Sequence, residues 1–328
     1  MPEALYGYDL FGEVVKPPTR GLIADEFLVP PFTVLNAREG FWQERKQAWL
    51  RIGITSADGR ANDITYGSSP EITQRGLLDC REKSRMSTTT VCATEWMQRG
   101  PNEGGSIFDP VLCELAYRWF TKQGQQIIDP FAGGSVRGIV AHELNRKYWG
   151  CDLRPEQVAA NETQAEAIQP DNRPQWVCGD ALDAVPNAPD ADFIFSCPPY
   201  GDLEVYSNDP KDLSNMSWET FLDAYRLIIR LACQSLRNNR FACFVVGDFR
   251  DSKGHYRDFV SKTIAAFQAS GLHLYNECIL VTAVGSLPIR IGRQFRSGRK
   301  LGKTHQNILV FVKGDWKEAA RVCGAEDE

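Results

Sequence analysis

The regular alternation of apolar runs and helix-like stretches between residues 106 and 315 is the feature that most constrains the fold. Apolar runs with the length and composition of buried strands lie at 125–130, 147–152, 175–180, 191–196 and 240–249. Stretches with a helical pattern lie at 109–122, 136–145, 154–168, 217–237 and 256–270. This alternation predicts an α/β fold in which a mainly parallel sheet carries helices on both faces.

Two further apolar runs, at 275–284 and 304–314, close the regular part of the sequence. The segment between them is rich in turn-forming residues and too short for the crossover that parallel strands need, so we expect an antiparallel pair. Together with the earlier runs, these strands predict a doubly wound, mostly parallel sheet of seven strands that ends in an antiparallel hairpin.

The first 105 residues have a different texture and predict an irregular N-terminal extension. Within it, a helix-like segment covers 41–53. Trp42 and Trp49 are seven residues apart in this segment and share one helical face, so we expect both in the core. The predicted organisation is 1–105 as the extension, 106–315 as the α/β domain and 316–328 as a C-terminal tail.

Composition limits the class of protein. Hydrophobic residues make up 43% and charged residues 24% of the chain, the balance of a soluble globular protein. There is no run of about 18 apolar residues and no apolar signal core near the N-terminus, so neither a membrane span nor a secretory signal is expected. The 10 cysteines contain no CxxC pair and the 4 histidines are scattered. We therefore expect reduced thiols, a cytoplasmic location and no metal site.

The segment DPFAGGSVRG, at 129–138, follows the first strand and precedes a helix. Glycines in such a turn let backbone N–H groups approach a ligand at the N-terminus of the helix. Their positions, 133, 134 and 138, do not fit the G-x-G-x-x-G spacing of dinucleotide-binding proteins. With the expected hairpin, this spacing disfavours a nucleotide-dependent dehydrogenase.

Aspartates end the first three strands of the predicted sheet: Asp129, Asp152 and Asp180. Because the carboxyl ends of parallel strands meet at one edge, we expect these side chains to converge in one crevice. Asp152 is placed to accept hydrogen bonds from two ribose hydroxyls, and Asp180 to meet an exocyclic amine. The alternative is that each aspartate only caps the helix that follows it.

The string FIFSCPPYGD, at 193–202, places two prolines directly after an apolar strand. Pro198 and Pro199 cannot donate to a strand ladder and make the backbone rigid, so a carbonyl points outward in a fixed direction. Tyr200 adds a flat ring, and the combination can accept hydrogen bonds from a planar amine and stack on it. The alternative is a plain turn with a surface tyrosine.

DPFAGG followed by an acidic second strand end and then by PPY after the fourth strand resembles the amino-methyltransferases. The resemblance covers about 106–315 and implies the class I methyltransferase fold, S-adenosylmethionine as cofactor and DNA as partner. The implied reaction methylates adenine N6 or cytosine N4 after the base has left the duplex. The whole chain also resembles methylases encoded by bacteriophages, which would act in the host cytoplasm.

The resemblance also implies residue roles. Asp129, Phe131, Ala132 and Gly133 would meet the methionine part of the cofactor, Asp152 its ribose and Asp180 its adenine, with Ser196 also on the cofactor side. The catalytic corner would comprise Cys197, Pro198, Pro199 and Tyr200, with the Pro198 carbonyl and the Tyr200 ring serving the target base. No metal is implied, and the oligomeric state stays open, a homodimer included.

Cys197 departs from the family pattern, which has Asp, Asn or Ser before the two prolines. A thiol is a weak hydrogen-bond acceptor. The position can act poorly or through its backbone, or an acceptor can come from the adjacent GDLE loop at 201–204. Alternatively, Cys197 is a nucleophile in carbon-5 chemistry on a pyrimidine, or the protein is an inactive DNA-binding homologue.

A basic segment at 286–305 lies between the last two strands in a chain of net charge −5. It contains no acid and carries Arg290, Arg293, Arg296, Arg299, Lys300 and Lys303. We expect this segment to contact a phosphate backbone, although a solvated turn is the alternative. The acidic loop 201–215 predicts a lid or a plain surface loop. The extension 1–105 is the predicted region for target recognition or a lid, with 75–105 favoured within it for target recognition. An RNA nucleobase is the alternative substrate.

Overall fold

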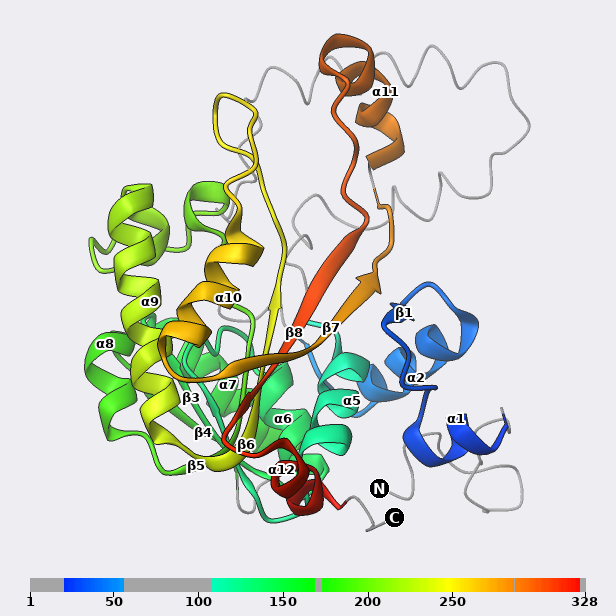
Figure 1. The fold of residues 1–328 in the computed structure, drawn as a ribbon, viewed down its shortest axis with the longest axis vertical. Coiled ribbons are helices and arrows are strands. Elements are labelled where there is room, and N and C mark those ends of the chain that lie inside the picture. The colour runs from blue at the N-terminus through cyan, green and yellow to red at the C-terminus, as the bar shows by residue number, and fades with distance from the viewer. Residues whose placement is uncertain (1–20, 56–107, 169–172, 286, 325–328) are drawn as a thin grey trace.

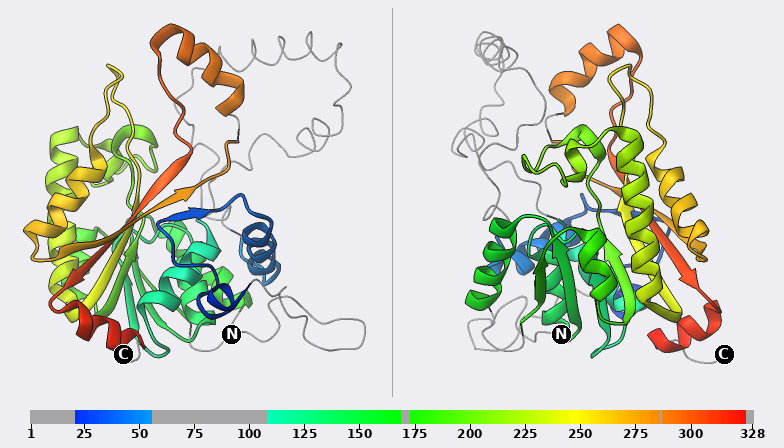
Figure 2. Two further views of the ribbon diagram at one scale, coloured as in Figure 1. Left: turned by 45° about the vertical axis from the view of Figure 1, so that its right-hand side comes forward. Right: turned by 90° about the vertical axis from the view of Figure 1, so that its left-hand side faces the viewer.

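The computed structural model describes residues 21–55, 108–168, 173–285 and 287–324. Over these residues a central twisted sheet carries helices on both faces (Figure 1, Figure 2). The predicted target-recognition stretch 75–105 lies outside the described residues. Among the helices of the described part, none combines the length and the apolar character that crossing a bilayer requires.

The sheet of the described residues has the strand order β1-β7-β8-β6-β5-β2-β3-β4. Its strands are β1 (Val34–Asn36), β2 (Gln126–Asp129), β3 (Lys147–Asp152), β4 (Gln175–Cys178), β5 (Ala191–Ser196), β6 (Leu236–Val246), β7 (His273–Val281) and β8 (His305–Lys313). β8 is antiparallel to both β6 and β7, and the other neighbouring strands are parallel. This topology confirms the predicted class I methyltransferase fold.

The central strands are apolar on both sides because both sides are covered. Ile127 packs into the core on one face of the sheet, and the next residue, Ile128, packs into the core on the other. In β5, Phe193 and Phe195 belong to the first core and Ile194 to the second. Continuous apolar runs of this kind are typical of parallel strands between two helix layers, which is why the sequence located them well.

Most of the longer helices in the described part pack against the sheet, in two groups. The bounds of the helices are α1 (Leu22–Phe27), α2 (Gly40–Arg51), α5 (Pro110–Phe120), α6 (Val136–Glu143), α7 (Pro155–Ile168), α8 (Ala181–Ala184), α9 (Trp218–Ser235), α10 (Phe259–Ala269), α11 (Leu287–Gly298) and α12 (Trp316–Cys323). Helices α2, α5, α6 and α7 bury side chains in the first core, and α9 and α10 in the second. Trp42 and Trp49 are both buried in the first core, as predicted.

The segment between the last two strands differs from the prediction. The sequence indicates a turn-rich connection, but the structure has the helix α11 here, which stands beyond the ends of β7 and β8 (Figure 1). Proline and glycine are typical of turns but are equally compatible with the two ends of a helix. Pro288 lies in the first turn of α11, and Gly298 is its last residue. The flanking strands still pair antiparallel, as expected.

Two elements add to the predicted architecture. β1, from the N-terminal extension, pairs parallel with β7 and becomes an eighth strand at the edge of the sheet. At the other end of the chain, α12 begins after Asp315, whose side chain accepts a hydrogen bond from the Glu318 N–H. Ala319 of this helix is buried in the first core, so both ends of the described chain contribute to the α/β domain.

Candidate active site

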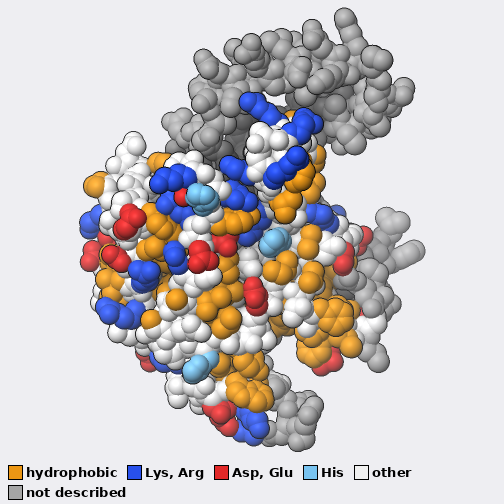
Figure 3. Space-filling model, turned by 45° about the horizontal axis from the view of Figure 1, so that its top comes forward, with side chains coloured by type: hydrophobic (Ala, Val, Ile, Leu, Met, Phe, Trp, Pro, Cys, Tyr) orange, Lys and Arg blue, Asp and Glu red, His pale blue; other side chains and the backbone are white. Residues whose placement is uncertain are grey.

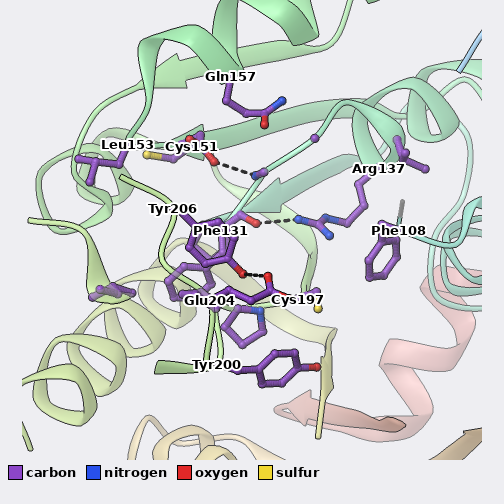
Figure 4. Close-up of a pocket in the computed structure, with 18 of the residues that line it drawn as sticks. Phe108, Phe131, Arg137, Cys151, Leu153, Gln157, Cys197, Tyr200, Glu204 and Tyr206 are labelled. Carbon is purple, nitrogen blue, oxygen red and sulfur yellow. Dashed lines mark hydrogen bonds between the residues drawn. The ribbon is translucent and has the colours of Figure 1, made fainter. Parts of the chain in front are cut away.

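A cavity of about 680 Å³ opens at the carboxyl edge of the sheet, where β2, β3, β4 and β5 end. Residues predicted from the sequence that line it are Phe131, Gly133, Asp152, Asp180, Cys197, Pro198, Pro199 and Tyr200. The structure therefore brings the glycine turn, two strand-end aspartates and the proline corner to one cavity (Figure 4). Asp129, Ala132 and Ser196 are fully buried and do not line it.

Asp129 ties the end of β2 to its neighbours. Its Oδ1 accepts hydrogen bonds from the Phe131 N–H at 3.2 Å and the Ser196 hydroxyl at 2.5 Å. Its Oδ2 accepts from Arg137 Nε and from the Tyr148 hydroxyl, the latter at 2.8 Å. Since both oxygens are bound by donors of the same chain, Asp129 organises the wall of the cavity, and direct contact with a cofactor stays a prediction.

Asp152 holds the glycine turn and faces the cavity. Its Oδ2 accepts a hydrogen bond from the Gly133 N–H at 3.0 Å, and its Oδ1 accepts one from the Arg154 N–H at 2.9 Å. Burial raises the pKa of Asp152 above its ordinary range and outweighs these hydrogen bonds, which lower it. Each oxygen retains a lone pair, so the carboxylate can accept further hydrogen bonds from a ligand.

Asp180 caps a helix, which was the alternative interpretation of this residue, and it also lines the cavity. Its Oδ1 accepts a hydrogen bond from the Leu182 N–H at 2.9 Å at the start of α8. Lys211 Nζ, from the loop 201–215, lies 3.9 Å from Asp180 Oδ2 and 3.6 Å from a carboxylate oxygen of Asp183. The loop is thereby connected to this end of the cavity.

Tyr200 is fixed by an aromatic cluster. Its ring lies edge-to-face against Phe249 and Phe259, with ring centroids 6.0 and 5.9 Å away. Its hydroxyl accepts a hydrogen bond from Gln306 Nε2 at 3.2 Å. The ring therefore has one defined orientation in the wall of the cavity, which is not the situation of the surface tyrosine that the sequence also allowed.

The Cys197 thiol lies in surroundings that disfavour its ionisation. Burial raises its pKa, and this effect outweighs the nearby Arg137 charge and the Tyr200 hydrogen bond, both of which lower it. The thiol is therefore neutral at physiological pH, whereas a nucleophilic cysteine needs the thiolate. The raised pKa gives no support to the carbon-5 alternative, which stays a prediction.

Arg137 is a central residue that the sequence analysis did not single out. Its Nη2 donates hydrogen bonds to the carbonyls of Phe131 and Ala132 at 2.6 and 2.7 Å, and its guanidinium lies 4.6 Å above the centre of the Phe108 ring. Arg137 belongs to the motif DPFAGGSVRG, at 129–138, and follows its glycine turn. The sequence pattern did not show that the side chain of Arg137, in the first turn of α6, points into the protein.

The N-terminal extension also contributes to the cavity wall, and its predicted role in target recognition or as a lid stays a prediction. Ala37, Gln43 and Lys46 line the cavity from the segment that contains β1 and α2. Lys46 Nζ forms an ion pair with Asp109 at 3.3 Å, at the N-terminus of α5. Gln43 and Lys46 lie on the helix predicted at 41–53, but the helical pattern did not show that this helix borders the cavity.

The loop 201–215 lies at the cavity and has a defined internal structure. Tyr206, Lys211 and Asp212 line the cavity. Asp212 accepts hydrogen bonds from the Ser207 hydroxyl at 2.8 Å and the Ser214 N–H at 2.9 Å. The loop thus forms part of the cavity wall, and its role as a lid stays a prediction.

The six basic residues of 286–305 fall into two groups. Arg290, Arg293, Arg296, Arg299 and Lys300 are exposed on and after α11, and Figure 3 shows Lys and Arg side chains gathered there. Lys303 is instead half-buried: a Cβ at Gly247 would lie 3.6 Å from its Nζ and 4.0 Å from the Tyr200 hydroxyl. None of the six lines the cavity.

No protein-family model matches the chain, and a search of curated proteins gives no match. Among solved structures, the chain is similar to TrmN from Thermus thermophilus, with 15% identity and a TM-score of 0.43, over 63% of this chain and 49% of that chain. It is also similar to a TehB-like SAM-dependent methyltransferase from Corynebacterium glutamicum, with 16% identity and a TM-score of 0.40, over 67% and 95% of the two chains. The chain thus spans about half of the TrmN chain that it matches.

Proposed function

We propose that the protein transfers a methyl group from S-adenosylmethionine to an exocyclic amine of a nucleobase in DNA, at adenine N6 or cytosine N4. The observation that carries the proposal is the cavity that joins Asp152 and Asp180 to the Pro198–Tyr200 corner. A methyl donor and a base held at these two places would meet in one enclosed space. Holding two reactants in this way supplies much of the rate increase that such a reaction needs.

The cofactor side of the cavity fits S-adenosylmethionine. Asp152 has carboxylate lone pairs for two ribose hydroxyls, and Asp180 can accept a hydrogen bond from an exocyclic amine. The glycine turn keeps side chains away, since a Cβ at Gly133 would find only an Arg137 nitrogen, at 4.0 Å. When bound, S-adenosylmethionine supplies a methyl group on a positively charged sulfur.

The opposite side of the cavity fits a planar base. The two prolines fix the direction of the Pro198 carbonyl, and the aromatic cluster fixes the ring of Tyr200. Hydrogen bonding of an amine N–H to the carbonyl moves the nitrogen lone pair out of the ring system and makes it a better nucleophile. A base can reach this position only after leaving the duplex, and Tyr200 would then stack on it.

DNA is the proposed partner because α11 follows the carboxyl end of β7, the edge of the sheet at which the cavity lies, and carries exposed arginines (Figure 1). The loop around Gly254 lies against the residues that follow α11, since a Cβ at Gly254 would be 2.7 Å from Lys300 Nζ. Arg250 of this loop stacks at 4.0 Å over the ring of Tyr256. Such cationic and aromatic groups are suited to a phosphate backbone with accessible bases.

The test of the proposed function is mass analysis of nucleosides after incubation of DNA or RNA with the protein and trideuteromethyl-labelled S-adenosylmethionine. We expect label in N6-methyladenine or N4-methylcytosine of DNA. Label in RNA alone, or no label in either, contradicts the proposal.

The variant Tyr200→Ala tests the corner within the same assay. We expect loss of methyl transfer with cofactor binding retained, because Tyr200 belongs to the proline corner on the base side of the cavity. Tyr275→Ala is the matched control, since Tyr275 lies on β7 against Trp316 and away from the cavity. Thermal melts of both variants separate loss of activity from loss of folding. If Tyr200→Ala methylates DNA as fast as the parent, the corner is wrongly assigned.

A further inference from the structure

Glu204 lines the same cavity as the proline corner and Cys197. We propose that Glu204 accepts a hydrogen bond from the second N–H of the target amine and takes the proton that the nitrogen releases. This assignment rests on the proposed function, because it names an additional residue of the same reaction. It answers the question that Cys197 raises, namely where the second acceptor comes from.

A second acceptor is needed because an exocyclic amine carries two N–H bonds. The Pro198 carbonyl can accept one of them. The Cys197 side chain is a poor partner for the other, since a neutral thiol is a weak acceptor. A buried N–H left without a partner is costly, so the corner without a further acceptor would hold the amine weakly.

A tight turn after Tyr200 leads to Glu204, which lines the cavity. Gly201 has a φ of 55°, and a Cβ there would lie 3.4 Å from the rings of Phe249 and Trp218. The Leu203 N–H then donates to the Tyr200 carbonyl at 3.1 Å and closes the turn. Figure 4 shows the Glu204 side chain beside Cys197, directed into the cavity.

Glu204 also has a lone pair to offer. Among the described residues, only the Tyr206 hydroxyl hydrogen-bonds to its carboxylate, donating to Oε2 at 2.7 Å, so Oε1 can accept from a ligand. The other carboxylates that line the cavity hold backbone N–H groups at helix starts or turns, namely Asp109, Asp152, Asp180 and Asp212. The Tyr206 bond fixes the direction of Glu204 without occupying both oxygens.

The chemistry of the step then balances. The nitrogen lone pair forms a bond to the methyl carbon while the bond from that carbon to sulfur breaks, and the electron pair of that bond stays on sulfur. The nitrogen becomes positively charged and loses one proton to the Glu204 carboxylate, which passes it to solvent. Proton transfer to a positioned base typically contributes about 10²–10⁴-fold to a rate.

The test compares Glu204→Ala and Glu204→Gln with the parent protein. Single-turnover transfer of the trideuteromethyl label gives the rate, and the fluorescence of 2-aminopurine at the target position reports how well the extruded base is held. We expect Glu204→Ala to lower the rate by about 10²-fold or more and to lose the fluorescence signal. Glutamine keeps an acceptor oxygen but is no base, so Glu204→Gln should hold the target base, with the fluorescence signal retained, and still transfer slowly.

Glu219→Gln is the matched control, because Glu219 is exposed in the first turn of α9 and does not line the cavity. Calorimetry should show unchanged cofactor binding in all three variants. A parent that methylates DNA while Glu204→Ala keeps its rate overturns the assignment alone. A parent that methylates no nucleobase amine overturns the proposed function and this assignment with it.

Discussion

At the scale of single residues, Asp152 offers the most direct test of the cofactor side. Replacing it with alanine removes the acceptor for a ribose and frees the Gly133 N–H, so we expect cofactor binding to weaken by about 1–3 kcal/mol. Titration calorimetry measures this change. Asp190→Asn is the control, since Asp190 is an exposed acid outside the cavity. Unchanged affinity in Asp152→Ala would remove this residue from the cofactor site.

The pH dependence of cofactor binding provides a second test of the same residue. Burial raises the pKa of Asp152, so its carboxylate takes up a proton at a higher pH than an ordinary aspartate. A ribose hydroxyl donates to the ionised form, so affinity should decrease as the pH falls through this raised pKa. The decrease should begin above the ordinary aspartate range of about 3.9. Asp152→Asn has no charge to lose and should bind with an affinity that does not follow this curve.

The residues proposed to face a ligand were easier to predict from the sequence than the buried residues that fix their positions. Asp152 and Tyr200 stand at or just after strand ends, so their place at the carboxyl edge follows from topology. The hydrogen bond between Ser196 and Asp129 joins residues 67 positions apart, and no local pattern contains that information. For the same reason Arg137 was missed, because its direction depends on where Asp129 stands after folding.

At the scale of elements, we predict that α11 binds the DNA backbone. Replacing Arg293, Arg296 and Arg299 together with glutamine should weaken DNA binding and reduce its dependence on salt, because fewer counterions are released on binding. The helix buries none of its residues, so its loss of charge should leave the melting temperature of the protein unchanged.

A matched control for α11 removes the same charge elsewhere. Arg51, Arg230 and Lys317 are exposed on three other helices, and their joint replacement with glutamine changes the net charge equally. Fluorescence anisotropy of labelled DNA at several salt concentrations distinguishes the two triple variants. Equal affinity and equal salt slopes for both would mean that α11 acts only as part of the overall charge.

Elements were predictable where burial imposes a pattern and unpredictable where it does not. β5 is buried at every position, and its apolar run is plain in the sequence. β1 has three residues and only Leu35 is buried, so it has no readable period. α11 has no buried residue, and without a buried face its glycines and proline resemble those of a turn.

At the scale of the whole molecule, a buried ion pair connects the N-terminal segment to the α/β domain. Arg45 of α2 and Glu114 of α5 are both 0% exposed, with Arg45 Nε 2.6 Å from Glu114 Oε2. The same carboxylate accepts hydrogen bonds from Trp49 at 2.7 Å and Arg118 at 2.8 Å. Burial raises the pKa of Glu114, but Arg45 and Arg118 outweigh it and hold the pKa below its usual range.

The ion pair holds α2 against the α/β domain. It therefore also holds Gln43 and Lys46 of α2 in the cavity wall. Replacing Arg45 with methionine leaves Glu114 charged and poorly compensated, so we expect a loss of about 3–5 kcal/mol in the free energy of unfolding. Glu114 has a lowered pKa in the folded state, so its stabilising contribution is present at neutral pH and is lost as the pH falls below about 4. Urea unfolding at neutral and acidic pH measures both effects. The double variant, Arg45→Met with Glu114→Leu, should recover much of the lost stability, because it also removes the unpaired charge. If Arg45→Met alone is as stable as the parent, this account of how the N-terminal segment is held is wrong.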